Sequence, residues 1–136
     1  MSVRFVNPEN YTAPTGMFSH VSVAEAGRLA FIAGQVAFDS DLKLVAPGDA
    51  AGQYPQVMAN IGKILDGIGA GFGDIVELTT YLVGEESRVA WLESRGAVME
   101  KHFGDGPYPP NTLLIIGGLA QPEMMVEVSA VVRLPG

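Results

Sequence analysis

The N-terminal part of the chain has the hydrophobic pattern of two strands. Residues 20–25 alternate polar and apolar positions, and residues 28–33 (RLAFIA) are mostly apolar. Gly27 separates the two segments and Gly34 follows the second, which is typical of strands joined by a tight turn. We therefore expect a β-hairpin here, followed by a short turn within residues 38–45.

Two later segments have helical periodicity. In the first, apolar residues recur at spacings of three and four: Met58, Ile61, Leu65 and Ile68. This pattern predicts a helix with one buried face, whose regular part begins near Tyr54, with Pro55 in the first turn and Asp49 capping a loose turn before it. Glycines between residues 67 and 73 are expected to end this helix and to form a connector rather than a phosphate loop, because they precede a strand. A second helix is predicted from about Glu86, with a stripe formed by Leu92, Gly96, Met99 and Phe103.

The remaining apolar segments predict strands at residues 75–83, 112–116 and 124–132. Along the last strand, alternate positions define two faces: Val126, Val128, Ala130 and Val132 on one, and Met125, Glu127, Ser129 and Val131 on the other. The order of elements predicts an α+β or α/β sandwich in which two helices cover one face of a sheet. Since the other face is partly apolar and no helix remains to cover it, we expect it to meet another subunit.

Composition narrows the class of protein. The chain has 136 residues, 48% of them hydrophobic and 17% charged, which favours one folded domain over residues 1–136 and excludes disorder. Eight basic and fifteen acidic residues give a net charge of −7, which argues against a nucleic-acid partner. With no cysteine, a thiolate nucleophile and thiolate metal sites are excluded. No secretory signal or apolar segment long enough to span a membrane is evident, so a cytoplasmic protein without a membrane partner is expected.

Few residues suggest chemistry by themselves. His20 and His102 do not have metal-ligand spacing, and we expect no metal. His102 is expected at the C-terminal end of the second helix, where it interacts favourably with the helix dipole. His20, at the start of a strand, is the better candidate of the two for a pocket residue. Glu127 lies between valines in a strand, where a carboxylate is costly unless it is paired, protonated or solvated by a pocket. The alternative to a functional role for Glu127 is a carboxylate that reaches solvent from an exposed face of the sheet. Asn111 stands at the start of a predicted strand, and the alternative to a functional role for it is a turn residue that bonds its own backbone.

Taken together, these residues resemble the Rid family, the reactive intermediate deaminases also called the YjgF family. The matching segments, in family order, are Gly16-Met-Phe-Ser19, residues 29–35 (LAFIAGQ), 60–65 (NIGKIL), 74–82 (DIVELTTYL) and 126–131 (VEVSAV). The resemblance implies a chorismate-mutase-like α+β fold, with one mixed sheet covered by two helices. It also implies a homotrimer with three intersubunit clefts.

The resemblance further implies a site. Family members with the best-known activity hydrolyse 2-imino or 2-enamino acids without a cofactor, using an Arg to grip the substrate carboxylate and a Glu to orient water. Glu127 matches that Glu and is the candidate catalytic residue, whereas Asn111 stands at the Arg position. The candidate ligand-binding residues are Phe18, Ala33, Gly34, Asn111 and Leu113.

Departures from the family pattern predict a less polar and more neutral cleft. Phe18 replaces a frequent Tyr, Ala33 a frequent Ser, and Gly96 a frequent Asn. An Asn amide supplies no charge, and a charged hydrogen bond is about twice as strong as a neutral one. A basic residue from another segment is the remaining alternative, although none of the eight lies next to position 111.

These observations leave three hypotheses for function. The first is hydrolysis, without a cofactor, of an imine or enamine that lacks the usual carboxylate and so is not 2-aminoacrylate, with Glu127 positioning water and Asn111 holding a carbonyl or amide. The second is a non-catalytic trimer that binds a small metabolite. The third, endoribonuclease activity, is disfavoured by the net negative charge.

Overall fold

The computed structural model describes residues 2–136. The elements in chain order are β1 (Val3–Val6), β2 (Val21–Ala24), β3 (Leu29–Gln35), α1 (Ala50–Gly67), the short 3₁₀ helix η1 (Phe72–Asp74), β4 (Ile75–Val83), α2 (Gly84–Phe103), β5 (Asn111–Ile116) and β6 (Val126–Arg133). The strand predicted at residues 75–83 is confirmed, and the last two strands lie within two residues of their predicted bounds.

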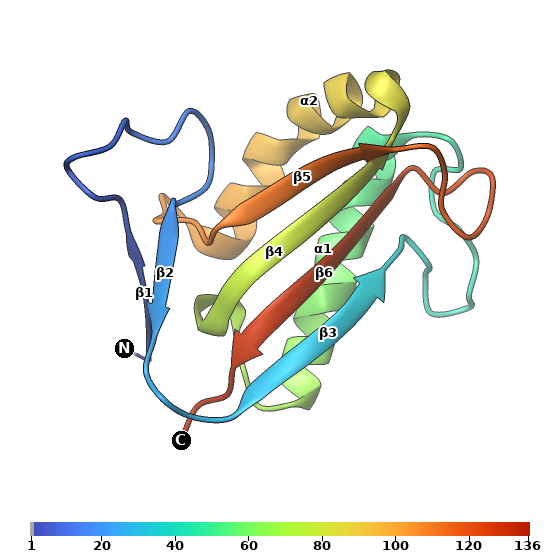
Figure 1. The fold of residues 1–136 in the computed structure, drawn as a ribbon. Coiled ribbons are helices and arrows are strands. Elements are labelled where there is room, and N and C mark those ends of the chain that lie inside the picture. The colour runs from blue at the N-terminus through green and yellow to red at the C-terminus, as the bar shows by residue number, and fades with distance from the viewer. Residues whose placement is uncertain (1) are drawn as a thin grey trace.

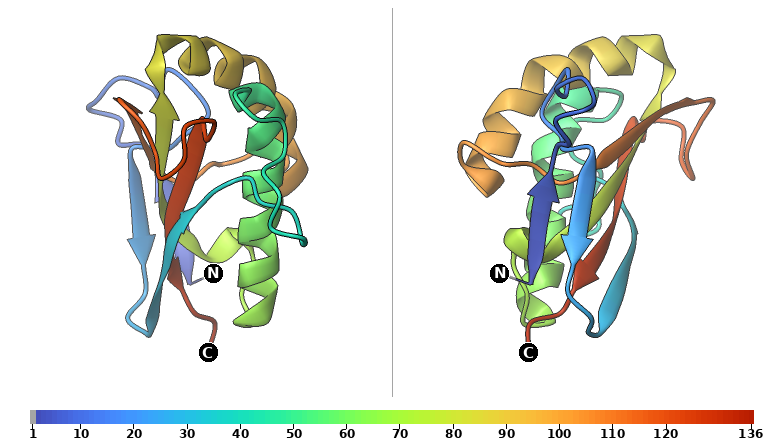
Figure 2. Two further views of the ribbon diagram at one scale, coloured as in Figure 1. Left: turned by 90° about the vertical axis from the view of Figure 1, so that its right-hand side faces the viewer. Right: turned by 60° about the vertical axis from the view of Figure 1, so that its left-hand side comes forward.

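The main sheet has four strands in the order β3-β6-β4-β5. β4 and β5 are parallel and are connected through α2, whereas β6 runs antiparallel to both β3 and β4. A parallel pair needs such a crossover, because a tight turn can join only antiparallel strands. Both helices lie behind the sheet in Figure 1, and the side view in Figure 2 shows them on one face of it. The predicted mixed sheet covered by two helices is therefore confirmed.

The predicted hairpin of residues 20–33 is wrong. β2 pairs with β1, which the sequence pattern did not reveal, and these two strands form a separate small sheet. β3 instead pairs with β6, from Leu29 opposite Arg133 to Gln35 opposite Val128. The buried Arg133 side chain holds the segment between β2 and β3, donating to the carbonyl oxygens of Glu25 at 3.2 Å and Ala26 at 2.6 Å. Gly27 is required there because an added Cβ would lie 2.6 Å from the Arg133 guanidinium carbon.

The start of α1 also differs from the prediction. The helix begins at Ala50, with the Asp49 carboxylate accepting a hydrogen bond from the Ala51 N–H at 3.0 Å. Pro55 lies inside the helix and has no N–H group to donate to the carbonyl one turn earlier. Because Pro55 is exposed, this carbonyl lies on the solvent side of the helix. The predicted turn within residues 38–45 is confirmed: Asp39 accepts from the N–H groups of Asp41 and Lys43.

The stripe predicted for α2 is only partly right. Met99 is buried and Phe103 packs against the core, but Leu92 is 40% exposed. The buried residues of α2 are Ser87, Trp91, Val98 and Met99. Since polar and apolar residues are mixed around this helix, its sequence gave only a weak indication of the buried face.

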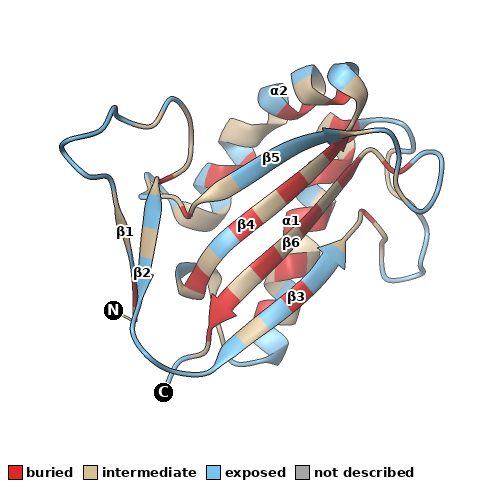
Figure 3. Ribbon diagram, in the orientation of Figure 1, coloured by how far each residue is buried: buried red, intermediate tan, exposed pale blue. Residues whose placement is uncertain are grey.

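The two faces of the sheet differ as the sequence predicts. Val126, Val128, Ala130 and Val132 are buried under the helices, and Glu127, Ser129 and Val131 on the other face are half-buried. Figure 3 shows this alternation along β4 and β6. We call the face without helices the open face. It includes Phe31 of β3, which is 75% exposed, and Leu114 of the edge strand β5, which is 39% exposed.

Candidate functional site

Glu127 lies on the open face, beside an irregular part of β3. The pairing of β3 with β6 shifts by one residue between Ile32 and Gln35, so Ala33 and Gly34 together face a single residue of β6. This is a β-bulge, a feature that often re-aims a side chain near an active site. Ala33 and Gly34 are both exposed.

Gly34 makes room for the Glu127 side chain. A Cβ at position 34 would lie 2.5 Å from the carboxyl carbon of Glu127, so the carboxylate rests directly over the glycine backbone. Within residues 2–136, Glu127 forms no ion pair and no side-chain hydrogen bond. The carboxylate is therefore positioned by packing and remains free to accept hydrogen bonds from a ligand or from water.

The other candidate residues lie around a cavity of about 170 Å³ between α2, β5 and the loop before β2. Its lining consists of Met17, Phe18, Arg88, Trp91, Leu92, Arg95, Met99, Asn111 and Leu113. The structure therefore brings Phe18, Asn111 and Leu113 together, as the resemblance implied. Gly96 is not among the lining residues, and an added Cβ there would contact nothing within 4 Å.

Asn111 is fixed at the beginning of β5. The preceding residue, Pro110, accepts a hydrogen bond from the Leu78 N–H of β4 at 2.9 Å, which sets the register of the two strands. The buried Thr80 hydroxyl donates to Asn111 Oδ1 at 2.9 Å. This bond leaves the amide NH₂ group of Asn111 as the donor available to the cavity.

Sequence reasoning missed two arginines of this cavity. Arg88 and Arg95 are about two helical turns apart on α2 and flank Trp91, and all three line the cavity. Their spacing of seven residues was a signal that they share a helix face, but nothing in the sequence related that face to Asn111. Arg88 is paired with Glu85, whereas Arg95 has no ion-pair partner within residues 2–136. Of the two expectations for the cleft, the basic residue from another segment therefore describes this cavity, and the neutral cleft does not.

Within one chain, the cavity and Glu127 lie on opposite faces of the sheet. Asn111 pairs with the buried Leu78 and bonds Thr80, which places it on the helix-covered side. Glu127 pairs with Tyr81 and alternates with the buried Val126 and Val128, which places it on the open face. The candidate residues thus form two separate groups: the cavity around Asn111, and Glu127 with Ala33 and Gly34.

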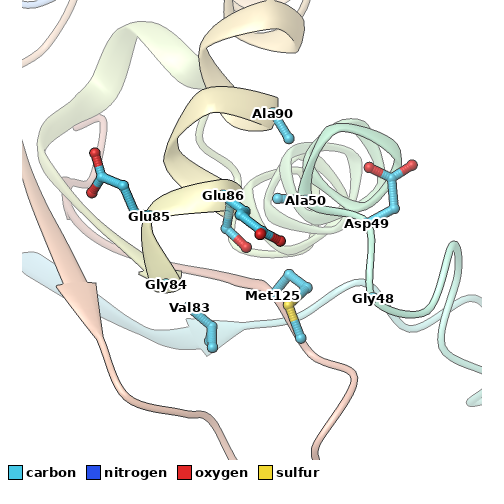
Figure 4. A pocket seen from close by; sticks show the side chains of 10 residues that line it. Gly48, Asp49, Ala50, Val83, Gly84, Glu85, Glu86, Ala90 and Met125 are labelled. Atoms are coloured by element: carbon cyan, nitrogen blue, oxygen red, sulfur yellow. The ribbon is translucent and has the colours of Figure 1, made fainter.

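A larger cavity of about 580 Å³ lies between the N-terminal ends of α1 and α2. Figure 4 shows Asp49, Glu85 and Glu86 around it. Asp49 caps α1, and Glu85 pairs with Arg88, so two of these three carboxylates have structural roles. In the part of the chain that the structure describes, no cluster of three or more potential metal ligands occurs.

Neither histidine lines the Asn111 cavity. The His20 ring is hydrogen-bonded to the Thr12 carbonyl oxygen at 2.8 Å and packs edge-on against Phe18. His102 lies in the last turn of α2, as predicted, and stacks on Phe72 with ring centroids 4.2 Å apart. Burial, with a smaller contribution from the positive charge of Lys101, lowers the pKa of His102 below its usual value.

The sheet order, the two covering helices and the site residues define an α+β protein of the type found in Rid structures. The family model described as "Endoribonuclease L-PSP" matches residues 9–134, and the chain belongs to this family, the RutC/Rid (YjgF/L-PSP) family. A similar solved structure is the Rid family protein YyfB from Yersinia pestis, with a TM-score of 0.84 and 33% identity over 98% of this chain and 100% of that chain.

Two relatives are informative about the breadth of the family. A RutC family protein from Pyrococcus abyssi is 32% identical over 131 residues, which is 96% of this chain and 97% of that protein. A mouse protein named 2-iminobutanoate/2-iminopropanoate deaminase is 29% identical over 70 residues, or 52% of each chain. The family therefore includes imine deaminases. None of the helices within residues 2–136 is long and apolar enough to cross a membrane.

Proposed function

We propose that this protein is a homotrimeric hydrolase of a small imine or enamine other than 2-aminoacrylate, and that it works without a cofactor. The observation that carries the proposal is the Glu127 carboxylate, which rests over Gly34 on the open face with no partner among residues 2–136. A carboxylate in this position is suited to accept a proton from water.

Assembly would complete the site. One chain places the Asn111 cavity and Glu127 on opposite sides of its sheet, so both groups can face one ligand only if they come from two copies. The exposed Phe31 and Leu114 give the open face apolar surface of the kind that subunit interfaces bury. In a closed ring of three chains, each cavity would meet the open face of a neighbour.

The proposed reaction consumes one water and releases one ammonia. Glu127 accepts a proton from water as the oxygen attacks the imine carbon, and passes that proton to the imine nitrogen to give a carbinolamine. As the C–N bond breaks, the hydroxyl proton of the carbinolamine is transferred through Glu127 to the leaving nitrogen, so that ammonia leaves and the carbon becomes a carbonyl. Asn111 would donate a hydrogen bond from its amide to a polar atom of the substrate.

2-Aminoacrylate is expected to be a poor substrate. It carries only a bare methylene group, which would leave the apolar walls formed by Phe18, Trp91 and Leu113 largely unfilled. Asn111 also lacks the charge of the Arg that the resemblance places there. We do not propose RNA cleavage, because a chain with a net charge of −7 repels a phosphate backbone.

The activity can be tested on imines generated in solution by an amino acid oxidase, with semicarbazide competing for the imine. A hydrolase lowers the yield of semicarbazone, and Glu127→Gln should reduce this effect by about 100-fold or more. Glu77→Gln is the matched control, because Glu77 is an exposed carboxylate of the neighbouring strand β4, paired with Val131 of the open face. No effect of the wild-type protein on any imine would contradict catalysis and favour the non-catalytic binding trimer.

Assembly can be tested independently by light scattering. The wild-type protein should have about three times the chain mass of 14.3 kDa. Phe31→Asp should give folded monomers, because it puts a charge where the trimer would bury an aromatic ring. A wild-type monomer at micromolar concentration would contradict the shared site.

A further inference from the structure

Arg95 is one of the residues that line the Asn111 cavity. Its guanidinium lies over the ring of Trp91, with 5.5 Å from the guanidinium carbon to the ring centroid. The loop before β2 also lies close to it, because a Cβ added to Gly16 would lie 3.0 Å from one terminal nitrogen of Arg95. These contacts hold the guanidinium in one place and so lower the conformational entropy lost on binding a ligand.

Within residues 2–136, the Arg95 guanidinium donates no hydrogen bond to another group of the protein. Its Nε atom is buried and has no hydrogen-bond partner, and no carboxylate within residues 2–136 pairs with its charge. Arg88, on the same helix, is different: its Nε donates to Glu85 at 2.6 Å. A buried N–H without an acceptor is costly and is uncommon in native structures unless a ligand or water satisfies it.

The charge of the cavity opposes that of the whole chain. The chain carries a net charge of −7 and has only eight basic residues, yet Arg88 and Arg95 line this cavity and no acidic residue does. Because Arg88 is paired with Glu85, the unpaired positive charge within residues 2–136 is that of Arg95. The Asn111 amide, which lines the same cavity, provides a second, neutral donor. Donors held in a partly apolar cavity recognise an anion more strongly than donors in water.

The size and walls of the cavity define the rest of the ligand. The cavity volume of about 170 Å³ is below the roughly 300 Å³ at which cavities for drug-sized ligands begin, so the ligand should be small. Apart from the arginines and Asn111, every lining residue is apolar or aromatic. The ligand should therefore combine one anionic group with a short apolar body.

We infer that Arg95 of α2 is the anion-binding residue of this protein, and that its cavity takes a small monocarboxylate with a short apolar body. The anion is bound by a residue of α2 rather than by a residue at the beginning of β5, where Asn111 stands. This inference deepens the proposed function, on which it rests only for the claim that the ligand is a substrate.

The test uses 3-methylbutanoate, which carries the carboxylate and cannot be hydrolysed, and its neutral analogue 3-methylbutanamide. Trp91 is the one tryptophan of the chain and lines the cavity, so its fluorescence reports binding directly. The carboxylate should bind at least tenfold more tightly than the amide. Arg95→Met should remove this preference while its aliphatic chain still packs on Trp91, and Arg95→Lys should retain part of it.

Arg88→Met is the matched control, since Arg88 lines the same cavity but is already paired with Glu85. It should weaken carboxylate binding by less than threefold, and thermal unfolding should show that all variants are folded. Equal binding of acid and amide, or an undiminished preference in Arg95→Met, would overturn the inference. If 3-methylbutanoate binds through Arg95 but no imine is hydrolysed, the proposed function fails and this inference stands. If imines are hydrolysed equally well by the wild-type protein and by Arg95→Met, the proposed function stands and this inference fails.

Discussion

The two faces of the four-stranded sheet are built from the same strands but meet different requirements. On the covered face, Leu78, Leu82, Val126 and Val128 are at most 2% exposed and pack against the helices. On the open face, the strands carry the partner-free carboxylate of Glu127 and the 75% exposed ring of Phe31. The covered face stabilises the fold, whereas the open face keeps groups that one chain does not need for folding. Side chains that are not needed for folding are candidates for a role in function.

The largest expected effect tests this division with neighbouring residues of β4. Leu78→Ala should lower the free energy of unfolding by about 2–5 kcal/mol, because it leaves a cavity under the helices. Thr79→Ala, on the open face, should lower it by less than about 1 kcal/mol. Urea unfolding at one fixed protein concentration measures both. Equal losses for the two variants would mean that the faces do not differ in the way described.

The next effect concerns Tyr54, which α1 places in the covered core with 1% of its surface exposed. Burial raises the pKa of Tyr54 to about 12, although the Trp91 N–H and the charge of Arg95 act in the opposite direction. The unfolded chain releases this proton near the ordinary value of 10.0, so stability is lost as the pH rises from about 10 to 12. The loss should be at most roughly 3 kcal/mol. Tyr54→Phe should show a smaller loss over the same pH range, and an unchanged alkaline profile would refute the assignment.

A smaller effect on stability is expected at the bulge of the open face. Gly34→Ala should change the free energy of unfolding by less than about 1 kcal/mol, because the group that must move is the flexible end of Glu127. The displaced carboxylate should nevertheless lower the proposed hydrolysis strongly. Gly73→Ala is the control, since nothing lies within 4 Å of a Cβ there. If Gly34→Ala retains full activity, the position of Glu127 over Gly34 is not important.

The smallest effect is expected at His102, at the end of α2. Its lowered pKa means that the unfolded chain binds the proton first as the pH falls, so stability decreases as the pH falls through the ordinary value of 6.5. His102→Phe keeps an aromatic ring against Phe72 and should flatten the stability profile below pH 7. Thermal unfolding between pH 5 and 8 measures this slope, and identical slopes in the two proteins would exclude His102 as its source.

The contrast between the two site groups indicates how far sequence reasoning reaches. The family resemblance pointed to Glu127, Gly34 and Phe18 because each stands in a matching local segment, and to Asn111 because it stands at the position of the family Arg, at the beginning of a predicted strand. Arg95 belongs to no such segment. It reaches the cavity because α2 crosses from β4 to the parallel β5 and so passes beside Asn111.

What the sequence determined by itself is local. The apolar run of residues 75–83 predicted a strand, and the spacing of Met58, Ile61 and Leu65 predicted a helix. The alternation in residues 126–132 predicted which side chains lie on each face of the sheet. Each of these follows from the repeat of a single element, which neighbouring residues encode. Only the tertiary structure decided that β3 pairs with β6 rather than β2, that Arg95 and Asn111 line one cavity, and that Glu127 lies across the sheet from both. The physical reason is that these relations depend on competition among distant segments for hydrogen bonds and buried surface, which no local repeat encodes.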